Sequence, residues 1–342
     1  MIKILRDNLQ KVYQKIAESK DLYLPINKAN EVNYGKYVDG ANVSIETLKT
    51  VKSAKDFFFP QSENMMKFKT ELGKIEIENA LKDVKDFVIF GVRACDYKSF
   101  EVLDNVFLSE PVDTFYKERR ESACIVTLAC NKPETSCFCK VFGIDASNPL
   151  GDVSSWLDEK YLYLQANTVK GEELISLIKE FSEDGGEKAV EEIKNGITEI
   201  INKLPYSNLD LSRFKPENLN ELFELEDWKE LSEGCLGCGA CTFVCPTCQC
   251  FDIRDFKTND GVIRFRCWDS CMYSDFTQMA AENSRKTQMQ RFRQRFMHKL
   301  CYFPSQYNGV YSCVGCGRCV NKCPQHLNII KVIKKIGSEN ND

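Results

Sequence analysis

Apolar residues in the first 204 positions follow two different periods. Leu5, Leu9, Val12 and Ile16 fall on one face of a helix, so an amphipathic helix is expected near the start of the chain. Short apolar runs predict strands at residues 22–25, 57–60, 87–92, 125–128 and 161–164. Helical spacing predicts helices at residues 63–72, 97–107, 172–181 and 190–204. Strands that alternate with helices favour an α/β fold for this part of the chain.

Polar stretches suggest where the chain divides. Residues 182–186 are polar with paired glycines and predict an exposed loop. Residues 205–216 contain two prolines and are the best linker candidate, and a helix is predicted after them at 217–232. We therefore predict an α/β domain at residues 1–215 and a smaller, α-helical, cysteine-rich domain at residues 216–342.

Composition and charge narrow the function. The 342 residues carry a formal charge of −4, which argues against nucleic acid as a partner. No apolar run reaches the length of about 18 residues that a membrane span needs, and the first residues do not form a signal peptide. A cytoplasmic protein is expected. Of the 18 cysteines, thirteen lie from Cys235 to Cys323, and such clustering in a chain without an export signal indicates metal binding rather than disulfides.

One cysteine pattern occurs twice in the second half. Cys235, Cys238, Cys241 and Cys245, followed by Pro246, repeat the spacing of Cys313, Cys316, Cys319 and Cys323, followed by Pro324. This C-x₂-C-x₂-C-x₃-C-P run is typical of ferredoxins with two [4Fe–4S] clusters, in which the fourth cysteine binds the other cluster. One predicted ligand set is therefore Cys235, Cys238, Cys241 and Cys323. The other is Cys313, Cys316, Cys319 and Cys245.

The alternative for these motifs is a pair of structural zinc sites. Zinc ligands usually come in separated pairs, whereas here three cysteines crowd into seven residues and the whole pattern recurs. Glycines inside both motifs allow the backbone to approach the cluster sulfurs closely. The spacing therefore predicts a ferredoxin-like domain with two clusters and a long insertion between them.

The first half contains a possible third cluster site. Cys95 and Cys130 follow predicted strands, and Cys137 and Cys139 lie in a short loop after the second of them. Strand ends of an α/β sheet converge on one edge, so these four thiols can meet there. Buried free thiols and a zinc site are the alternatives. Cys124 begins its strand and is expected in the core, and Arg93 and Asp96 are expected to form an ion pair that orients the loop.

The insertion between the motifs, residues 247–312, carries further cysteines and cations. Its thiols are either buried packing residues, which we favour because their spacing matches no standard ligand set, or ligands of a further cluster: Cys248, Cys250, Cys267, Cys271 and Cys301. Its basic residues are expected near the anionic clusters, at a partner interface or on a solvated helix face: Arg285, Lys286, Arg291, Arg293, Arg295, His298 and Lys299.

These motifs together resemble one iron–sulfur protein family. The resemblance rests on Gly91-Val-Arg-Ala-Cys95-Asp96, Cys137-Phe-Cys139, Cys245-Pro-Thr-Cys248-Gln-Cys250-Phe-Asp252, Trp268-Asp-Ser-Cys271-Met272 and the second motif, within residues 55–330. The family contains the β subunits of soluble hydrogenases (sulfhydrogenases) and the corresponding iron–sulfur subunits of anaerobic sulfite reductases. It implies a cluster in the first domain as well. Residues 57–63 are more similar to the hydrogenase-type branch.

What is absent completes the expected function. The sequence has no G-x-G-x-x-G segment, so FAD or NAD is not expected in this chain, and nothing indicates an acid–base pair or an activated nucleophile. We expect a non-catalytic electron-transfer subunit of an anaerobe's oxidoreductase complex. The resemblance implies a flavin- and NAD(P)H-binding partner, with a catalytic subunit or a ferredoxin at the other end. The alternatives are the iron–sulfur subunit of an anaerobic sulfite reductase, a catalytic site at the first-half cluster, and a metal-stabilised scaffold.

Overall fold

The first part of the chain is built on a mixed sheet of eight strands. The computed structural model describes residues 1–71, 74–81 and 84–337. Along the sheet the strands are β10 (Glu183–Asp184), β1 (Ile2–Leu5), β9 (Tyr161–Ala166), β8 (Val153–Leu157), β7 (Ala123–Leu128), β6 (Phe87–Val92), β2 (Asp21–Lys28) and β3 (Glu31–Lys36). Strands β2, β6, β7 and β8 are parallel, and antiparallel strands flank them on both sides.

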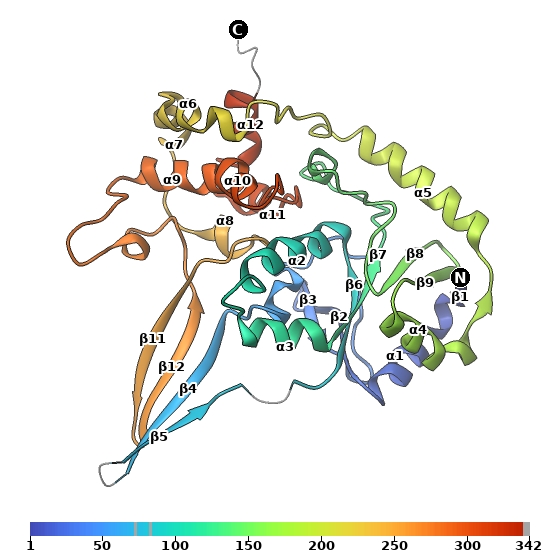
Figure 1. The fold of residues 1–342 in the computed structure, drawn as a ribbon. Coiled ribbons are helices and arrows are strands. Elements are labelled where there is room, and N and C mark those ends of the chain that lie inside the picture. The colour runs from blue at the N-terminus through green and yellow to red at the C-terminus, as the bar shows by residue number, and fades with distance from the viewer. Residues whose placement is uncertain (72–73, 82–83, 338–342) are drawn as a thin grey trace.

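Helices cover both faces of this sheet (Figure 1). Side chains of α1 (Leu9–Ala17) and α4 (Val169–Leu177) pack with Val88 and Phe90 on one face. Those of α2 (Ala94–Phe107) and, through Tyr116, α3 (Thr114–Ser122) pack with Ile89 and its neighbours on the other. This alternation along the buried strand β6 confirms the predicted α/β arrangement. The opening helix begins one turn later than predicted, because Leu5 ends strand β1 and pairs with Tyr161 of β9.

A second, antiparallel sheet projects from the body of the molecule (Figure 1). Its order is β11 (Phe251–Thr258), β12 (Gly261–Trp268), β4 (Ser62–Glu71) and β5 (Lys74–Asn79). The predicted helix at 63–72 is wrong, because pairing with β12 and β5 overrides the local helix preference; Leu72 lies outside the described residues. The predicted strand at 57–60 is also wrong, since a 3₁₀ turn at Ala54–Phe57 buries its aromatic side chains against the first sheet.

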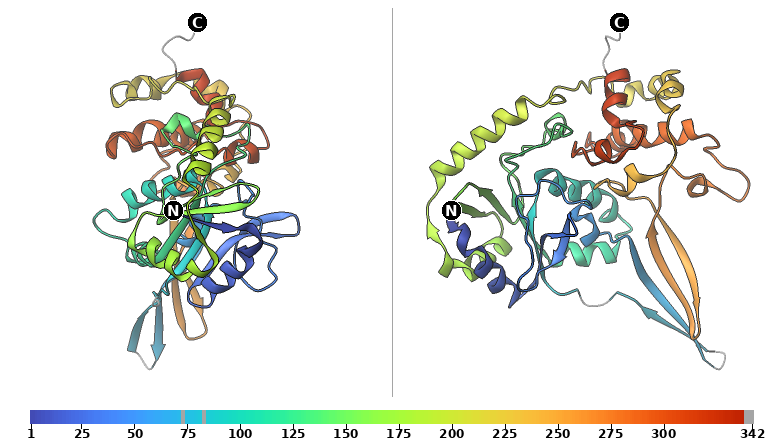
Figure 2. Two further views of the ribbon diagram at one scale, coloured as in Figure 1. Left: turned by 90° about the vertical axis from the view of Figure 1, so that its right-hand side faces the viewer. Right: turned by 180° about the vertical axis from the view of Figure 1, so that it is seen from behind.

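The C-terminal part is mainly helical and lies above the first sheet in Figure 2. Its helices are α6 (Leu219–Glu224), α7 (Asp227–Ser232), α8 (Ala240–Phe243), α9 (Gln288–Met297), α10 (Phe303–Gln306), α11 (Arg318–Lys322) and α12 (Ile329–Ile336). Trp228, Phe292, Phe296 and Ile333 are in its core. The helix predicted at 217–232 is interrupted between α6 and α7. The insertion is not wholly helical, because it supplies β11 and β12.

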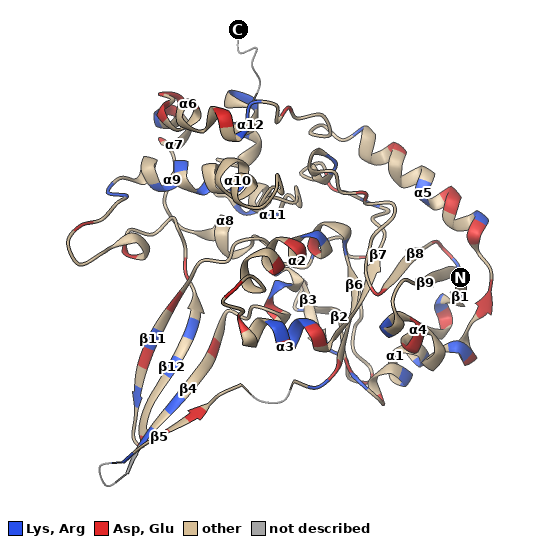
Figure 3. Cartoon of the chain, in the orientation of Figure 1, with Lys and Arg blue, Asp and Glu red and all other residues tan. Residues whose placement is uncertain are grey.

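Helix α5 (Glu187–Asn202) and the polar segment after it connect the two parts along one side of the molecule (Figure 1). The prediction placed this helix at 190–204, and the loop predicted at 182–186 contains the short edge strand β10. Charges of both signs are interspersed over α5 and the projecting sheet (Figure 3). The domain division at 215/216 stays a prediction, and the second sheet combines strands from both sides of it. In the described ranges, no helix is long and apolar enough to cross a membrane.

Candidate metal centres

The first-motif set, Cys235, Cys238, Cys241 and Cys323, lines a single cavity. Two turns inside the motif require glycine, because Gly237 and Gly239 have φ values of 66° and 73°. The loop then enters α8. The fourth thiol, Cys323, reaches the cavity from the far end of the second motif, just after α11. The four thiols predicted to share one cluster are thus brought together from segments more than 80 residues apart.

The walls of this cavity suit an anionic group bound by thiolates. Arg295 lines it with only 3% of its surface exposed, and its Nε atom has no hydrogen-bond partner. The backbone N–H of Leu327 donates to Sγ of Cys323 at 3.3 Å, and Nε2 of Gln288 donates to Sγ of Cys235 at 3.6 Å. A buried, unpaired guanidinium together with four thiols and N–H donors fits a [4Fe–4S] cluster.

The second-motif set is Cys313, Cys316, Cys319 and Cys245. Cys245 raises the pKa of each of the other three thiols, although burial is the larger cause for all of them. Its position beside them follows from α8, which packs against α11 and directs the end of the first motif toward the second. Each motif therefore lends its fourth cysteine to the other, as the spacing predicts. The assignment of ligands stays a prediction that this arrangement supports.

The N-terminal set, Cys95, Cys130, Cys137 and Cys139, gathers at the carboxyl ends of parallel strands. Cys95 lies in the first turn of α2 directly after β6, and Cys130 follows β7. Burial raises the pKa of Cys130 to about 11, and Cys137 contributes to that rise. Burial likewise raises the pKa of Cys139 to about 12, with smaller contributions from Cys130 and Cys137. The four thiols therefore lie within electrostatic reach of one another. Neutral buried thiols must lose protons to bind iron.

Cys124 is placed differently from these four. It lies at the start of β7, is buried in the core of the first sheet, and its thiol contacts the carbonyl oxygen of Lys170 at 3.8 Å. The prediction that it is a core residue is confirmed.

The N-terminal set adjoins the second motif directly. The N–H of Phe138 donates to the carbonyl oxygen of Gly315 at 2.9 Å. A Cβ atom at Gly315 would lie 2.6 Å from the backbone nitrogen of Cys139, so only glycine permits this approach. Cys316 in turn contributes to the raised pKa of Cys95, behind burial and Asp96. The loop that supplies three second-motif thiols is thus one wall of the N-terminal set.

A buried ion pair fixes this junction. Arg318 of the second motif binds both carboxylate oxygens of Asp96, at 2.5 and 2.7 Å, and its Nε donates to the carbonyl oxygen of Thr50 at 3.1 Å. The expected pair between Arg93 and Asp96 is wrong. Arg93 instead donates to backbone carbonyl oxygens, including that of Ala129 at 2.7 Å, because the loop after β7 passes directly beside it.

The basic residues of the insertion divide into two groups. Arg295 and Lys299 are buried and face thiols: Nζ of Lys299 lies 3.4 Å from Sγ of Cys245. Burial by itself would lower the pKa of Lys299, but Cys245 and Cys248 raise it. The others have different surroundings. Arg293 stacks on Phe223 with 3.5 Å to the ring centroid, and Lys286 is exposed beside Glu282. Sequence reasoning does not single out Lys55, a third buried cation near these thiols.

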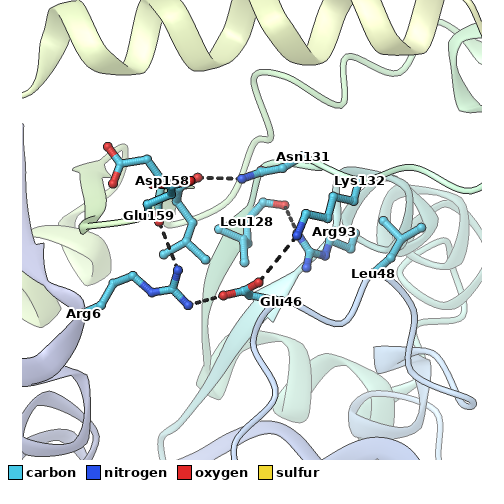
Figure 4. Close-up of a pocket in the computed structure, with 10 residues that line it drawn as sticks. Arg6, Glu46, Leu48, Arg93, Leu128, Asn131, Lys132, Asp158 and Glu159 are labelled. Carbon is cyan, nitrogen blue, oxygen red and sulfur yellow. Dashed lines mark hydrogen bonds and ion pairs between the residues drawn. The ribbon is translucent and has the colours of Figure 1, made fainter.

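A pocket lies beside the N-terminal set (Figure 4). Arg6, Glu46, Arg93 and Asn131 are among its lining residues. Most of their polar groups are paired: Arg6 with Glu46, and Nδ2 of Asn131 with the carbonyl oxygen of Leu157 at 2.6 Å. Nε of Arg93 and Oδ1 of Asn131 are buried without partners.

No three or more His, Cys, Asp or Glu side chains in the described ranges are placed to hold one metal ion directly. That observation concerns single ions. In a cubane each thiolate binds a different iron, so the ligands lie farther apart than around one ion.

Comparisons with known proteins first define a class. Residues 234–327 match the family model of the 4Fe-4S dicluster domain, so the C-terminal part of the chain is an iron–sulfur domain of this kind. The chain is also 29% identical, over 98% of its length and 98% of the relative's, to sulfhydrogenase 2 subunit beta of Pyrococcus furiosus. The resemblance seen in the motifs is thereby confirmed for the whole chain: it is similar to an iron–sulfur subunit of the hydrogenase type. No solved structure matches it.

Proposed function

We propose that this chain is the electron-transfer subunit of a cytoplasmic, hydrogenase-type oxidoreductase complex. It relays electrons between a flavin- and NAD(P)H-binding partner and a catalytic subunit or a ferredoxin. Three [4Fe–4S] clusters, held by the first-motif, second-motif and N-terminal sets, would supply the chemistry, because each takes up and releases single electrons. The chain itself holds the thiols close together, buries them and surrounds them with compensating charge.

The observation that carries this proposal is the contact between the three sets. Cys139 of the N-terminal set lies against Gly315 of the second motif, and Cys316 acts electrostatically on Cys95. At the other side, Cys241 is among the groups that raise the pKa of Cys319, behind burial. The three sets form one continuous series through the protein. Such a series suits passage of electrons and has no evident use in a scaffold.

The two ends of this series differ in exposure. Cys238 of the first-motif set is exposed, and the adjacent Leu236 exposes 66% of its surface. Three thiols of the N-terminal set are buried beneath the first sheet's loops. We infer that a protein partner docks at the first-motif end, where a thiol site reaches the surface.

The hydrogenase-type complex is favoured over a sulfite reductase by the relative that matches the whole chain, which is named as a sulfhydrogenase subunit. A second candidate function, a catalytic site in the first domain, is favoured by one observation, the pocket of Figure 4 with the unpaired Nε of Arg93. An Arg93→Met variant separates the two. A relay tolerates this change if the N-terminal iron is retained, whereas a substrate site loses turnover with its iron intact.

The iron content of the protein purified without oxygen tests the proposed relay. The three sets account for about twelve irons and twelve sulfides per chain. A Cys95→Ala variant is expected to hold about four fewer of each and to lose one component of the EPR spectrum of the reduced protein. Cys124→Ala, which removes a buried thiol outside the sets, is the matched control and keeps all of its iron. Equal iron in the two variants would remove the N-terminal site from the proposal.

A further inference from the structure

The base of the β11–β12 hairpin brings together three thiols that the two motifs do not use. Cys248 and Cys250 precede β11, and Cys271 follows β12. The strands pair from Phe251 opposite Trp268, and the N–H of Asp269 extends the ladder by donating to the carbonyl oxygen of Cys250 at 2.9 Å. The chain ends thus leave the hairpin side by side, and the side chains of Cys250 and Cys271 hydrogen-bond to each other.

Cys248 joins this pair to the second-motif set. Its side chain hydrogen-bonds to that of Cys245, and Cys271 acts on it electrostatically. All three thiols are partly buried. The remaining cysteines of the insertion are placed differently: Cys301 is buried among apolar residues such as Leu300, and Cys267 lies on β12 opposite Asp252. The thiols brought together here are therefore Cys248, Cys250 and Cys271.

Buried cations surround these thiols. Lys55 exposes 2% of its surface, and its Nζ atom contacts only the carbonyl oxygen of Cys248, at 2.9 Å, and the Trp268 ring, at 3.6 Å from the centroid, among the contacts found in the described part of the chain. Lys299 and Arg295 face Cys248 as well, and Nε of Arg295 has no partner. A buried, uncompensated cation costs several kcal/mol, so three of them indicate an anionic group between them.

We propose that Cys248, Cys250 and Cys271 bind a further iron–sulfur cluster, held by three thiolates of this chain. Thiolates that bind iron carry the negative charge that Lys55, Lys299 and Arg295 lack as neighbours in the chain itself. The choice of an iron–sulfur cluster over zinc rests on the proposed function, since the site adjoins the second-motif set through Cys245. The packing role favoured from the sequence does not account for three buried cations gathered around these thiols.

Iron and sulfide content of the full chain, purified without oxygen, tests this site. The triple variant Cys248→Ser/Cys250→Ser/Cys271→Ser is expected to lose about four irons and four sulfides from a wild-type total of about sixteen, together with one component of the Mössbauer and reduced EPR spectra. The matched control is Cys301→Ser, which removes a buried thiol of the same insertion and keeps the full iron content. If the triple variant does not fold, Cys250→Ser and Cys271→Ser are measured singly in the same way.

Three results would overturn the site. Equal iron in the triple variant and the control shows that the thiols are packing residues. Zinc in place of iron at unchanged sulfide shows a mononuclear metal site. Two fewer titratable thiols in the denatured wild type, restored by a reductant, show a Cys250–Cys271 disulfide. The proposed relay fails separately, because it is tested by Cys95→Ala: iron loss in the triple variant without loss in Cys95→Ala rejects the N-terminal site and keeps this one.

Discussion

The motif sets and the N-terminal set achieve the same gathering of four thiols by different means. Each motif set takes three thiols from one seven-residue loop, in which glycines at positive φ turn the backbone, and a fourth from the other motif. The N-terminal set draws its thiols from the start of α2, the end of β7 and the following loop, which only the sheet brings together. The motif loops carry their own geometry, whereas the N-terminal set depends on the tertiary structure around it.

The junction between the two regions makes this dependence testable. The N-terminal loop with Phe138 lies on the second-motif loop, and Arg318 reaches across to Asp96. Changes at the junction should therefore release iron from the N-terminal set and leave the first-motif set loaded.

The largest effect is expected from breaking the buried ion pair. Arg318→Ala leaves the carboxylate of Asp96 buried and unpaired, which should destabilise the protein by about 3–5 kcal/mol. Urea unfolding without oxygen, with iron content measured alongside, checks this. The exposed pair of Arg254 and Asp252 supplies the control, since Arg254→Ala should cost less than about 1 kcal/mol. The double variant Asp96→Asn/Arg318→Met should recover most of the loss; if it does not, the ion pair is not the cause.

A glycine comparison isolates the close approach at the same junction. Gly315 and Gly309 both have positive φ, 58° and 81°, but only Gly315 has backbone atoms where a Cβ would lie. Gly315→Ala should therefore cost about 1–3 kcal/mol more than Gly309→Ala and release the N-terminal iron. Urea midpoints and iron contents of the two variants provide the measurement. Equal values would mean that the two loops are not in contact in solution.

A pH effect should be confined to the motif region. Burial, and then Lys299 and Arg285, lower the pKa of His298 to about 4, below its value in the unfolded chain. The unfolded state therefore binds a proton first as the pH falls, and stability is lost between pH 6.5 and 4. Between pH 7 and 5 the loss is about 2 kcal/mol, and His298→Phe should abolish it. Urea midpoints at the two pH values measure this difference, and an unchanged difference in the variant would assign the acid sensitivity to other groups.

The smallest effect concerns the potential of the first-motif site. Gln288→Leu removes the N–H that donates to Sγ of Cys235, a loss of about 1 kcal/mol, or about 40 mV for one electron. The midpoint potential should fall, because such a donor stabilises the more negative, reduced state. An EPR-monitored redox titration checks this, with the N-terminal signal as the internal reference. A shift of both signals together would point to a general structural change.

Local patterns predict elements well and fail where pairing partners are distant. Strand β6 has the same residues as its prediction, because every side chain from Phe87 to Val92 is apolar or glycine and buried. Strand β4 is predicted as a helix, since Met65 and Lys67 suit helices and its partner β12 lies almost 200 residues away. The predicted ion pair joins Asp96 to the nearest arginine in sequence, whereas its partner, Arg318, is more than 200 residues distant.

The sequence by itself determined the chemistry of this protein: the repeated cysteine spacing is a property of short loops, and short loops are encoded by neighbouring residues. Only the tertiary structure decided which thiols meet across long separations. It placed Cys139 against the second motif, and it gathered Cys248, Cys250 and Cys271 at the base of a hairpin among buried cations. The reason is physical: the partners of a buried charge are chosen by packing and desolvation in three dimensions, and no spacing along the chain records that choice.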